Sequence, residues 1–381
     1  MKIGILTQPL HANYGGLLQN YALQQTLIQV GHEVETIDWD VNHGMRETLS
    51  NVKLKMLHAI FPNKYPPVYY QLNEKEKAII QRNTNYFIKK YIKRTEVVHS
   101  HKNFARQATS GNYGGFVVGS DQCWRPCYNI FLSAMFLDFV QDSQVRRVAY
   151  AASFGTDKWE FTAQQTTVCK SLAQKFDLVT VREDTGMELC KEHFGVDAAH
   201  VLEPTMLLTK EDYIRLVEKE REPKSNGTLF NYILDPSAKK SAFIKNVAES
   251  KGFEPFKVLP KFQAETRTKD DIKNRIEDCV FPSVTAWLRA FMDAEMTIVD
   301  SFHGMVFSII FNKPFWVIGN IVRGMSRFTS LLKMFHLEDR LINVDNLDDV
   351  EFSKPIDWNV VNAILEEKRC ESKTLLLNEF N

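Results

Sequence analysis

The chain has 381 residues, of which 44% are hydrophobic and 25% are charged. This composition is that of an ordinary globular protein of about two to three domains, large enough to fold without disulfides or metal ions. The 47 Lys and Arg residues balance the 47 Asp and Glu residues. Because the net charge is zero, no global field attracts the chain to nucleic acid or to an anionic membrane, and any basic site must be local.

The six cysteines are scattered and include no Cys-x-x-Cys pair. Cys123 and Cys127 are the closest, and since no His/Cys cluster accompanies them, buried thiols are favoured over a metal half-site. Residues 1–6 are too short an apolar run for a signal peptide, and the apolar stretch 305–322 is interrupted at 312–314 by Asn-Lys-Pro. We therefore expect a cytoplasmic protein with no bound metal and no transmembrane segment.

The N-terminal half alternates short apolar runs with helical spacing. Residues 2–6 predict a buried strand, 17–30 a helix and 34–39 a second strand, and this βαβ order predicts a right-handed crossover in a parallel sheet. The charge-rich stretch 54–94 predicts helices around a proline-containing break. Further strands are expected at 115–119, 147–151, 178–182 and 200–202.

A polar stretch at 218–227, which contains proline, serine, asparagine and glycine, is the best candidate for a linker. The α/β alternation restarts after it, and the charged stretch 265–278 predicts a mobile excursion. The expected strands are 228–234, 254–259, 296–300 and 315–318, and the expected helices are 239–251, 284–294, 305–311 and 358–380.

The sequence therefore predicts an α/β protein with one domain over residues 1–217 and a second over 228–357. The C-terminal helix, 358–381, is expected to pack back on the N-terminal domain. Two α/β domains joined by a linker place a ligand cleft between them, at the carboxyl ends of the strands. Four polar segments that follow predicted strands are candidates for this cleft.

The first of these segments is His-Ala-Asn-Tyr-Gly-Gly at 11–16. It does not match Gly-x-Gly-x-x-Gly, so its support for a dinucleotide site is weak. Its adjacent glycines permit close backbone approach and expose amide N–H groups where a helix begins. Asn13, Tyr14 and Gly15 are therefore candidate cleft residues, and a tight strand-to-helix turn is the alternative.

The second segment, at 119–126, is Gly-Ser-Asp-Gln-Cys-Trp-Arg-Pro. A buried strand stops here at a carboxylate and an amide beside an aromatic ring and a cation, a combination common in sugar contacts. The candidate residues are Ser120, Asp121, Gln122, Trp124 and Arg125. The alternative is a helix N-cap at Ser120 or Asp121 with Trp124 in the core.

The third segment is Asp-Ser-Phe-His-Gly at 300–304. A helix N-terminus disfavours a charged imidazole, so we expect a lowered pKa for His303 and a neutral ring poised to exchange protons. Backbone N–H groups from Gly304 onward would suit a phosphate or carboxylate. A purely structural histidine is the alternative.

The fourth segment, at 323–328, is Arg-Gly-Met-Ser-Arg-Phe. Arg323 and Arg327 are spaced i, i+4 on an incipient helix, where their guanidiniums can converge on one anion. A solvated helix face is the alternative.

Together these segments resemble the polysaccharide pyruvyl transferase family. The resemblance rests on Asn-Tyr-Gly at 13–15, Gly-Ser-Asp-Gln-x-Trp at 119–124 and Ser-Phe-His-Gly at 301–304. Supporting matches lie at 150–155, 181–183, 307–314 and 323–328, and the likeness runs from residue 1 to about 345. Two residues depart from the family pattern: Ser301 replaces a frequent arginine, and Glu203 replaces the usual Asp before proline.

The resemblance implies a GT-B-like fold of two Rossmann-like domains, with the acceptor on the N-terminal side and the donor on the C-terminal side. It implies transfer of a pyruvyl group from phosphoenolpyruvate, as co-substrate and without a cofactor, onto two sugar hydroxyls as a cyclic ketal. His303 is implied as the catalytic residue, with Asp121 as candidate base or hydroxyl anchor. The donor-side candidates are Ser301, Gly304, Lys313, Arg323 and Arg327, and the acceptor-side candidates are Asn13, Tyr14, Gly15, Ser120, Gln122, Trp124 and Arg125.

Two alternatives stay open. GT-B architecture hosts many donors, so a glycosyltransferase that uses a nucleotide-sugar is one, and a non-catalytic glycan-binding relative is the other. The expected partners are phosphoenolpyruvate and a sugar or glycan, with its linkage to a lipid left open, and no nucleic acid. A peripheral contact with the inner membrane face through 53–70 is one interpretation of that basic and aromatic stretch, and a solvated helical face is the alternative.

Overall fold

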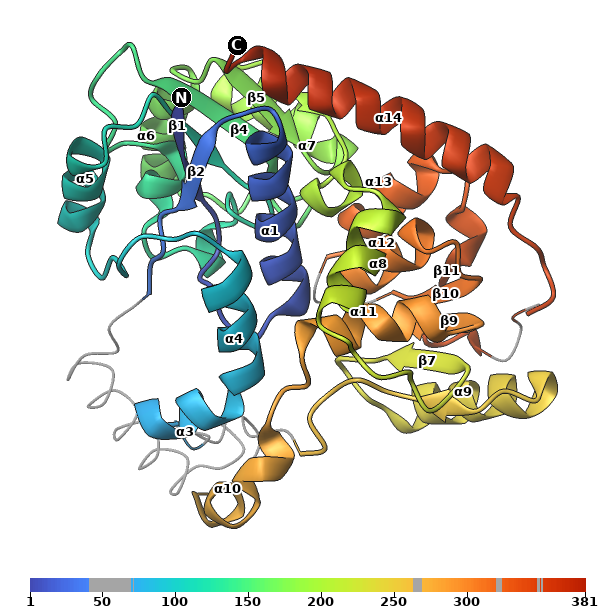
Figure 1. Ribbon diagram of the computed structural model, residues 1–381. Helices are drawn as coiled ribbons and strands as arrows, with labels where there is room; N and C mark the ends of the chain where they lie inside the picture. Colours follow the sequence, from blue (N-terminus) through green and yellow to red (C-terminus); the bar gives the residue numbers. More distant parts are fainter. Residues whose placement is uncertain (41–69, 71, 263–268, 320–323, 348–349, 351) are drawn as a thin grey trace, which may run out of the picture.

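The computed structural model describes residues 1–40, 70, 72–262, 269–319, 324–347, 350 and 352–381. These residues form two parallel β-sheets, one from each half of the chain, each enclosed by helices (Figure 1). Apolar clusters lie on both faces of each sheet. This explains why the strands appear in the sequence as continuous apolar runs rather than as alternating patterns.

The N-terminal sheet has the strand order β2-β1-β3-β4-β5-β6. Strand β1 places Ile3 opposite Val34 of β2 and Gly115 of β3, and all neighbouring strands are parallel. Helices α1 and α14 supply apolar residues to one face, and α5 and α6 to the other. The strands are β1 (Lys2–Leu6), β2 (Glu33–Thr36), β3 (Gly115–Val118), β4 (Arg146–Ala152), β5 (Leu178–Val181) and β6 (Ala199–His200), and the helices are α1 (Tyr14–Gln29), α5 (His101–Ser110), α6 (Ala163–Ala173) and α14 (Trp358–Asn378).

The C-terminal sheet has the order β11-β10-β9-β7-β8 and is also parallel. Helix α9 covers one face, and α11 and α12 cover the other. The strands are β7 (Leu229–Tyr232), β8 (Pro255–Phe256), β9 (Met296–Val299), β10 (Phe315–Ile318) and β11 (Leu341–Ile342), and the helices are α9 (Ala238–Lys251), α11 (Val284–Asp293) and α12 (Phe302–Ile310).

Shorter elements connect and extend the two sheets. The other α-helices are α3 (Glu74–Ile80), α4 (Arg82–Tyr91), α7 (Asp184–Leu189), α8 (Lys210–Lys219), α10 (Lys269–Arg275) and α13 (Ser326–Met334). The 3-10 turns are Pro126–Tyr128, Leu132–Phe136, Pro204–Leu207, Ile276–Cys279 and Glu338–Arg340, and a π turn spans Cys190–Phe194.

The C-terminal helix α14 crosses from the second half of the chain to the first (Figure 1). Its beginning joins the apolar core of the C-terminal sheet through Val361, and its end joins that of the N-terminal sheet through Leu376. Between them, Arg369 Nε donates to the Met206 carbonyl at 2.8 Å, and Ser372 Oγ accepts from the Leu202 amide at 3.0 Å. Domain boundaries at 217, 228 and 357 stay a prediction.

Two local expectations change. Helix α12 begins at Phe302 rather than at 305, because Ser301 Oγ caps it by accepting from the Gly304 amide at 3.0 Å. The sequence predicted an excursion over 265–278, but residues 269–275 form α10, whose Ile272 is packed with apolar side chains of α3. Residues 41–69, and with them the proposed membrane-contacting stretch 53–70 except for its last residue, lie outside the described residues.

Candidate functional site

A pocket of about 750 Å³ lies where the two sheets face each other. Its walls come from segments that directly follow β1, β3, β7 and β9, together with the starts of α1 and α13. The carboxyl ends of parallel strands leave their last polar groups unpaired by the sheet, so this is where an open α/β fold binds ligands. The pocket is therefore the candidate active site.

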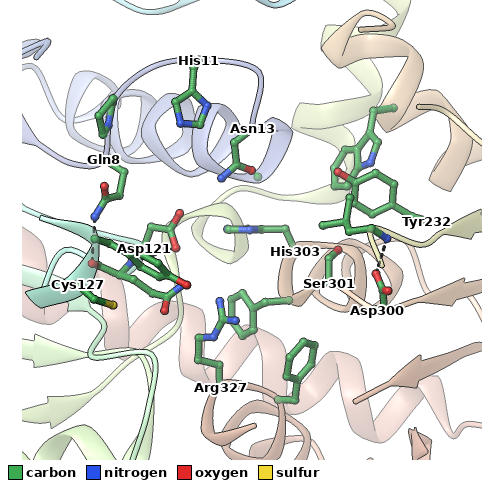
Figure 2. A pocket seen from close by; sticks show the side chains of 18 of the residues that line it. Gln8, His11, Asn13, Asp121, Cys127, Tyr232, Asp300, Ser301, His303 and Arg327 are labelled. Atoms are coloured by element: carbon green, nitrogen blue, oxygen red, sulfur yellow. Dashed lines mark hydrogen bonds between the residues drawn. The ribbon is translucent and has the colours of Figure 1, made fainter. Parts of the chain in front are cut away.

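Seven of the predicted site residues line this pocket. They come from both halves of the chain, and Figure 2 shows the side chains of Asp121, His303 and Arg327 pointing toward one another. The seven are Asn13, Gly15, Asp121, Gln122, Ser301, His303 and Arg327.

Three other predicted residues are buried beside the pocket and serve the core. Tyr14 packs against Trp287 at 5.7 Å between ring centroids, and its hydroxyl donates to the Pro282 carbonyl. Trp124 is fully buried against Phe136, and Ser120 donates from Oγ to a strand carbonyl. Trp124 therefore lies in the core, which was the alternative to a site residue in the sequence analysis.

The remaining candidates are engaged elsewhere or lie outside the described residues. Arg125 makes a bidentate ion pair with Glu160, with Nε at 2.9 Å and Nη2 at 3.0 Å from the carboxylate. Lys313 follows the C-terminal end of α12, whereas the pocket is at its N-terminal end, and its Nζ donates to a backbone carbonyl. The Gly304 amide caps the helix, so it offers no donor to a ligand. Arg323 lies outside the described residues.

His303 is held at the second residue of α12 by close contact with the other half of the chain. Gly15, in the first turn of α1, lies against the imidazole so closely that a Cβ there would be 2.1 Å from Nδ1. Only glycine permits this approach. The first of the two adjacent glycines, Gly15, is thus explained by packing against His303.

Burial is the main cause that lowers the pKa of His303, to about 3; the Asp121 carboxylate opposes the shift, and Arg182 and Arg327 add to it. The direction agrees with the sequence prediction, but the cause is the buried, cationic surroundings rather than the helix N-terminus. His303 is therefore a neutral imidazole at physiological pH.

Asp121 carries the negative charge of the site. Its backbone has φ of 65°, in the left-handed region, which turns the chain sharply after β3. Burial alone would raise the pKa of Asp121, but the positive charge of Arg182, whose Nη2 lies 3.5 Å from Oδ1, and that of Arg327 hold it below the ordinary value. Asp121 is thus ionised and able to accept a proton or a hydroxyl hydrogen bond.

Two guanidiniums, from Arg182 and Arg327, face the same aromatic ring. Their Cζ atoms lie 4.4 Å and 5.8 Å from the centroid of Phe302. Burial and the neighbouring Arg182 lower the pKa of Arg327 to about 10, which leaves it protonated at neutral pH. Only Arg327 lines the pocket, so it is the cation placed to meet an anionic ligand.

A family model for polysaccharide pyruvyl transferases matches residues 13–321, which is most of the chain. The chain belongs to the polysaccharide pyruvyl transferase family. This membership makes it a transferase with a glycan acceptor. No curated protein sequence matches the chain. Within the described residues of this family member, every helix is too short or too polar to cross a membrane.

One solved structure supports the fold of this pyruvyl transferase family member. UDP-GlcNAc 2-epimerase from Methanocaldococcus jannaschii is similar over 98% of this chain and 99% of its own, with a TM-score of 0.51 and 11% identity. The enzyme of the same name from Neisseria meningitidis aligns over 100% and 99%, with a TM-score of 0.49 and 9% identity. The likeness to the first concerns the fold alone, which is α/β and GT-B-like.

Two buried charged residues of this family member, Arg182 and Glu203, were not predicted as site residues from the sequence. Arg182 directly follows β5. The Oε2 atom of Glu203 lies 3.8 Å from the Nε2 atom of His303. Both were noted only as part of the family pattern. A charged residue directly after a buried strand, at the same sheet edge as Asp121, was the signal that identifies Arg182.

Tyrosine and tryptophan side chains from both halves of the chain also line the pocket. Trp39 and Tyr128 come from the N-terminal half, as does Gln8, and Tyr232 and Trp287 come from the C-terminal half. Trp39, Tyr232 and Trp287 are buried, whereas Tyr128 is half exposed. Of these four rings, that of Tyr128 is the one open to contact with a sugar.

The described part of the chain contains no cluster of side chains that could bind a metal ion. No group of three or more His, Cys, Asp or Glu residues has the arrangement of a metal site there. All six cysteines are free thiols. Cys123 is buried as expected, but Cys127 is exposed, because it lies in a 3-10 turn at the pocket rim.

Proposed function

We propose that this transferase moves the pyruvyl group of phosphoenolpyruvate onto two hydroxyls of a glycan or glycan precursor, forming a cyclic ketal. The observation that carries the proposal is the convergence of a neutral His303, an ionised Asp121 and a protonated Arg327 in one pocket. The reaction needs a proton-exchanging group, a base and an anion-binding cation, and these three residues supply them.

The first step of the proposed reaction is addition of one sugar hydroxyl to C2 of the donor. Asp121 accepts the hydroxyl proton. His303, once protonated beside the bound anionic donor, delivers a proton to the methylene carbon and later regains one from the second hydroxyl. Phosphate then leaves through an oxocarbenium-like species, and the second hydroxyl closes the ketal. Overall, one hydroxyl proton ends on the new methyl group and the other leaves with phosphate.

The donor is an anion, and Arg327 is our candidate for holding it. Ser301 stands at the pocket where relatives often carry arginine, so the compensating charge must come from elsewhere. Arg327 lines the pocket, and Arg182 behind Phe302 adds positive potential without reaching the ligand. Asn13, Gln122 and the half-exposed Tyr128 ring are proposed to hold the acceptor.

Phosphate release from phosphoenolpyruvate across a panel of acceptor sugars tests the proposed function. We expect release that requires both donor and a matching acceptor, with a pyruvylated sugar as product. In a parallel thermal-shift assay, phosphoenolpyruvate at 100 times its Kd should stabilise the protein by about 2.7 kcal/mol. Stabilisation by a nucleotide-sugar instead would point to glycosyl transfer, and sugar binding without phosphate release would indicate a non-catalytic relative.

Arg327→Ala is expected to raise the KM for phosphoenolpyruvate by about 10- to 100-fold, because a buried charged hydrogen bond to the donor is lost. The acceptor KM should stay nearly unchanged. Steady-state kinetics with each substrate varied in turn measures both. Lys313→Ala is the matched control, since Lys313 lies away from the pocket and its loss should leave the donor KM as it is. An effect on the acceptor KM alone would move Arg327 to the sugar side.

A further inference from the structure

Glu203 is completely buried directly behind His303, on the side away from the pocket. It follows β6 and begins the 3-10 turn Pro204–Leu207, and its exposed fraction is 0%. Its Oε2 lies 3.8 Å from His303 Nε2. Neither carboxyl oxygen nor Nε2 has a hydrogen-bond partner of ordinary geometry. A buried acid and a buried base thus face each other at a separation just beyond that of a hydrogen bond.

Such an arrangement is costly unless it has a use. A buried polar atom without a hydrogen bond destabilises the folded state, and three such atoms meet here, namely both carboxyl oxygens of Glu203 and His303 Nε2. A movement of less than 1 Å brings Oε2 and Nε2 within hydrogen-bond distance, since about 2.9 Å is typical of such a bond. The pair is therefore poised to form this bond when the pocket contents change.

The surroundings keep the proton on Glu203. Burial is the main cause that raises the pKa of Glu203, to about 8, and the nearby Asp121 carboxylate raises it further; Arg182 and the Thr205 backbone N–H oppose this shift. Tyr150 of β4 and Tyr213 of α8 are the other titratable groups that sense Glu203, and burial raises the pKa of each. Among the described residues, these groups and His303 on α12 surround Glu203, and its burial beside Asp121 keeps it a neutral carboxylic acid at physiological pH.

We propose that Glu203 stores a proton and passes it to His303 when the anionic donor binds. This inference rests on the proposed function, because the negative charge of phosphoenolpyruvate beside the ring is what favours an imidazolium there. The Glu203 O–H bond breaks, the lone pair of His303 Nε2 takes the proton, and the resulting imidazolium faces the new carboxylate. A neutral imidazole thereby becomes the acid that the methylene carbon requires.

Each proton that moves during one turnover has a source and a destination. The imidazolium releases its Nδ1 proton to the methylene carbon, which forms the C–H bond. When the second hydroxyl closes the ketal, its proton goes to Nδ1, and the Nε2 proton returns to Glu203. The first hydroxyl proton, held by Asp121, leaves with phosphate. Glu203 acts only through His303 and is therefore a positioning residue rather than a catalytic one.

Glu203→Gln tests the proton store, because the amide keeps the shape and neutrality of the acid but has no acidic proton. We expect a fall in kcat of about 10²- to 10⁴-fold with the donor KM little changed. In the native protein, kcat/KM for the donor should fall as pH rises through about 8, because the donor-free protein then loses the proton stored on Glu203. This decrease at high pH, the alkaline limb of the pH profile, should be absent from the residual activity of Glu203→Gln.

Glu203→Asp is the conservative control. It keeps an acidic proton on a shorter side chain, so it should recover part of the rate together with an alkaline limb. A purely structural role predicts the reverse order, with the isosteric Gln variant the less affected. Full kcat and an unchanged alkaline limb in Glu203→Gln would overturn the proton store while leaving pyruvyl transfer in place.

Infrared difference spectroscopy of the native protein supplies a second readout that needs no variant to fold. Adding phosphoenolpyruvate should remove a carboxylic-acid C=O stretch and create a carboxylate band, and Glu203→Gln should lack both changes. A carboxylic-acid band that persists on donor binding, in protein that releases phosphate on turnover, would refute this inference alone. Native protein that neither binds nor consumes phosphoenolpyruvate would overturn the proposed function and the inference with it.

Discussion

His303→Ala is expected to lower kcat for phosphate release by about 10²- to 10⁴-fold while the protein stays folded. The ring lines the pocket and is the group proposed to carry protons between donor and acceptor. Truncation removes this function but leaves α12, whose N-cap is Ser301, in place. Steady-state kinetics at saturating donor and acceptor measures the loss, and circular dichroism checks the fold.

His101→Ala is the matched control for this change. His101 is half exposed at the start of α5 and pairs with Asp138, away from the pocket. Its loss should leave kcat within about twofold of the native value, as expected for a surface substitution. Native kcat in His303→Ala would remove the imidazole from the mechanism and leave Asp121 as the remaining candidate for proton transfer.

Gly15→Ala is expected to lower kcat by about 10²-fold, although alanine is the better helix former. The added Cβ would lie 2.1 Å from Nδ1 and 2.2 Å from Cγ of His303, well inside van der Waals contact. Either the imidazole turns away from its position or the start of α1 moves away from α12. Both outcomes misplace the ring, and kcat with a thermal unfolding midpoint measures the result.

Gly16→Ala separates this steric effect from a general effect of alanine in α1. A Cβ at Gly16 meets only the side chain of Asn13, at 3.1 Å, which a small shift relieves. We expect nearly native kcat and a change in stability within about 1 kcal/mol. Equal effects of the two substitutions would show that the close approach of Gly15 to His303 has no bearing on activity.

Most helices and strands, and the parallel character of the first βαβ unit, were predictable from the sequence. The strands at 2–6, 115–118 and 315–318 appear as continuous apolar runs because both faces of each sheet are covered. The start of α12 was predicted three residues late, since Ser301 caps the helix through its side chain and a cap leaves little trace in hydrophobic periodicity. Helix α10 was missed because it packs against α3 through few apolar residues.

The candidate site was only partly predictable. Asp121 and His303 were identified because each follows a buried strand, and such strand ends gather at one edge of a parallel sheet. Trp124 shares a segment with Asp121 but lies in the core against Phe136, since the chain turns sharply at Asp121, whose φ is 65°. Glu203 was overlooked as a site residue, since its chemistry depends on burial next to His303 and on nothing in its own segment.

The sequence by itself determined the two parallel α/β halves, the polar strand ends and the glycine that permits the approach to His303. Only the tertiary structure decided which polar groups meet: it joined Asp121 and His303 across the two halves and placed Lys313 outside the pocket. The physical reason is that local periodicity reports which face of an element is buried. The pKa of His303 or Glu203, in contrast, depends on burial and charge contributed by segments distant in the chain.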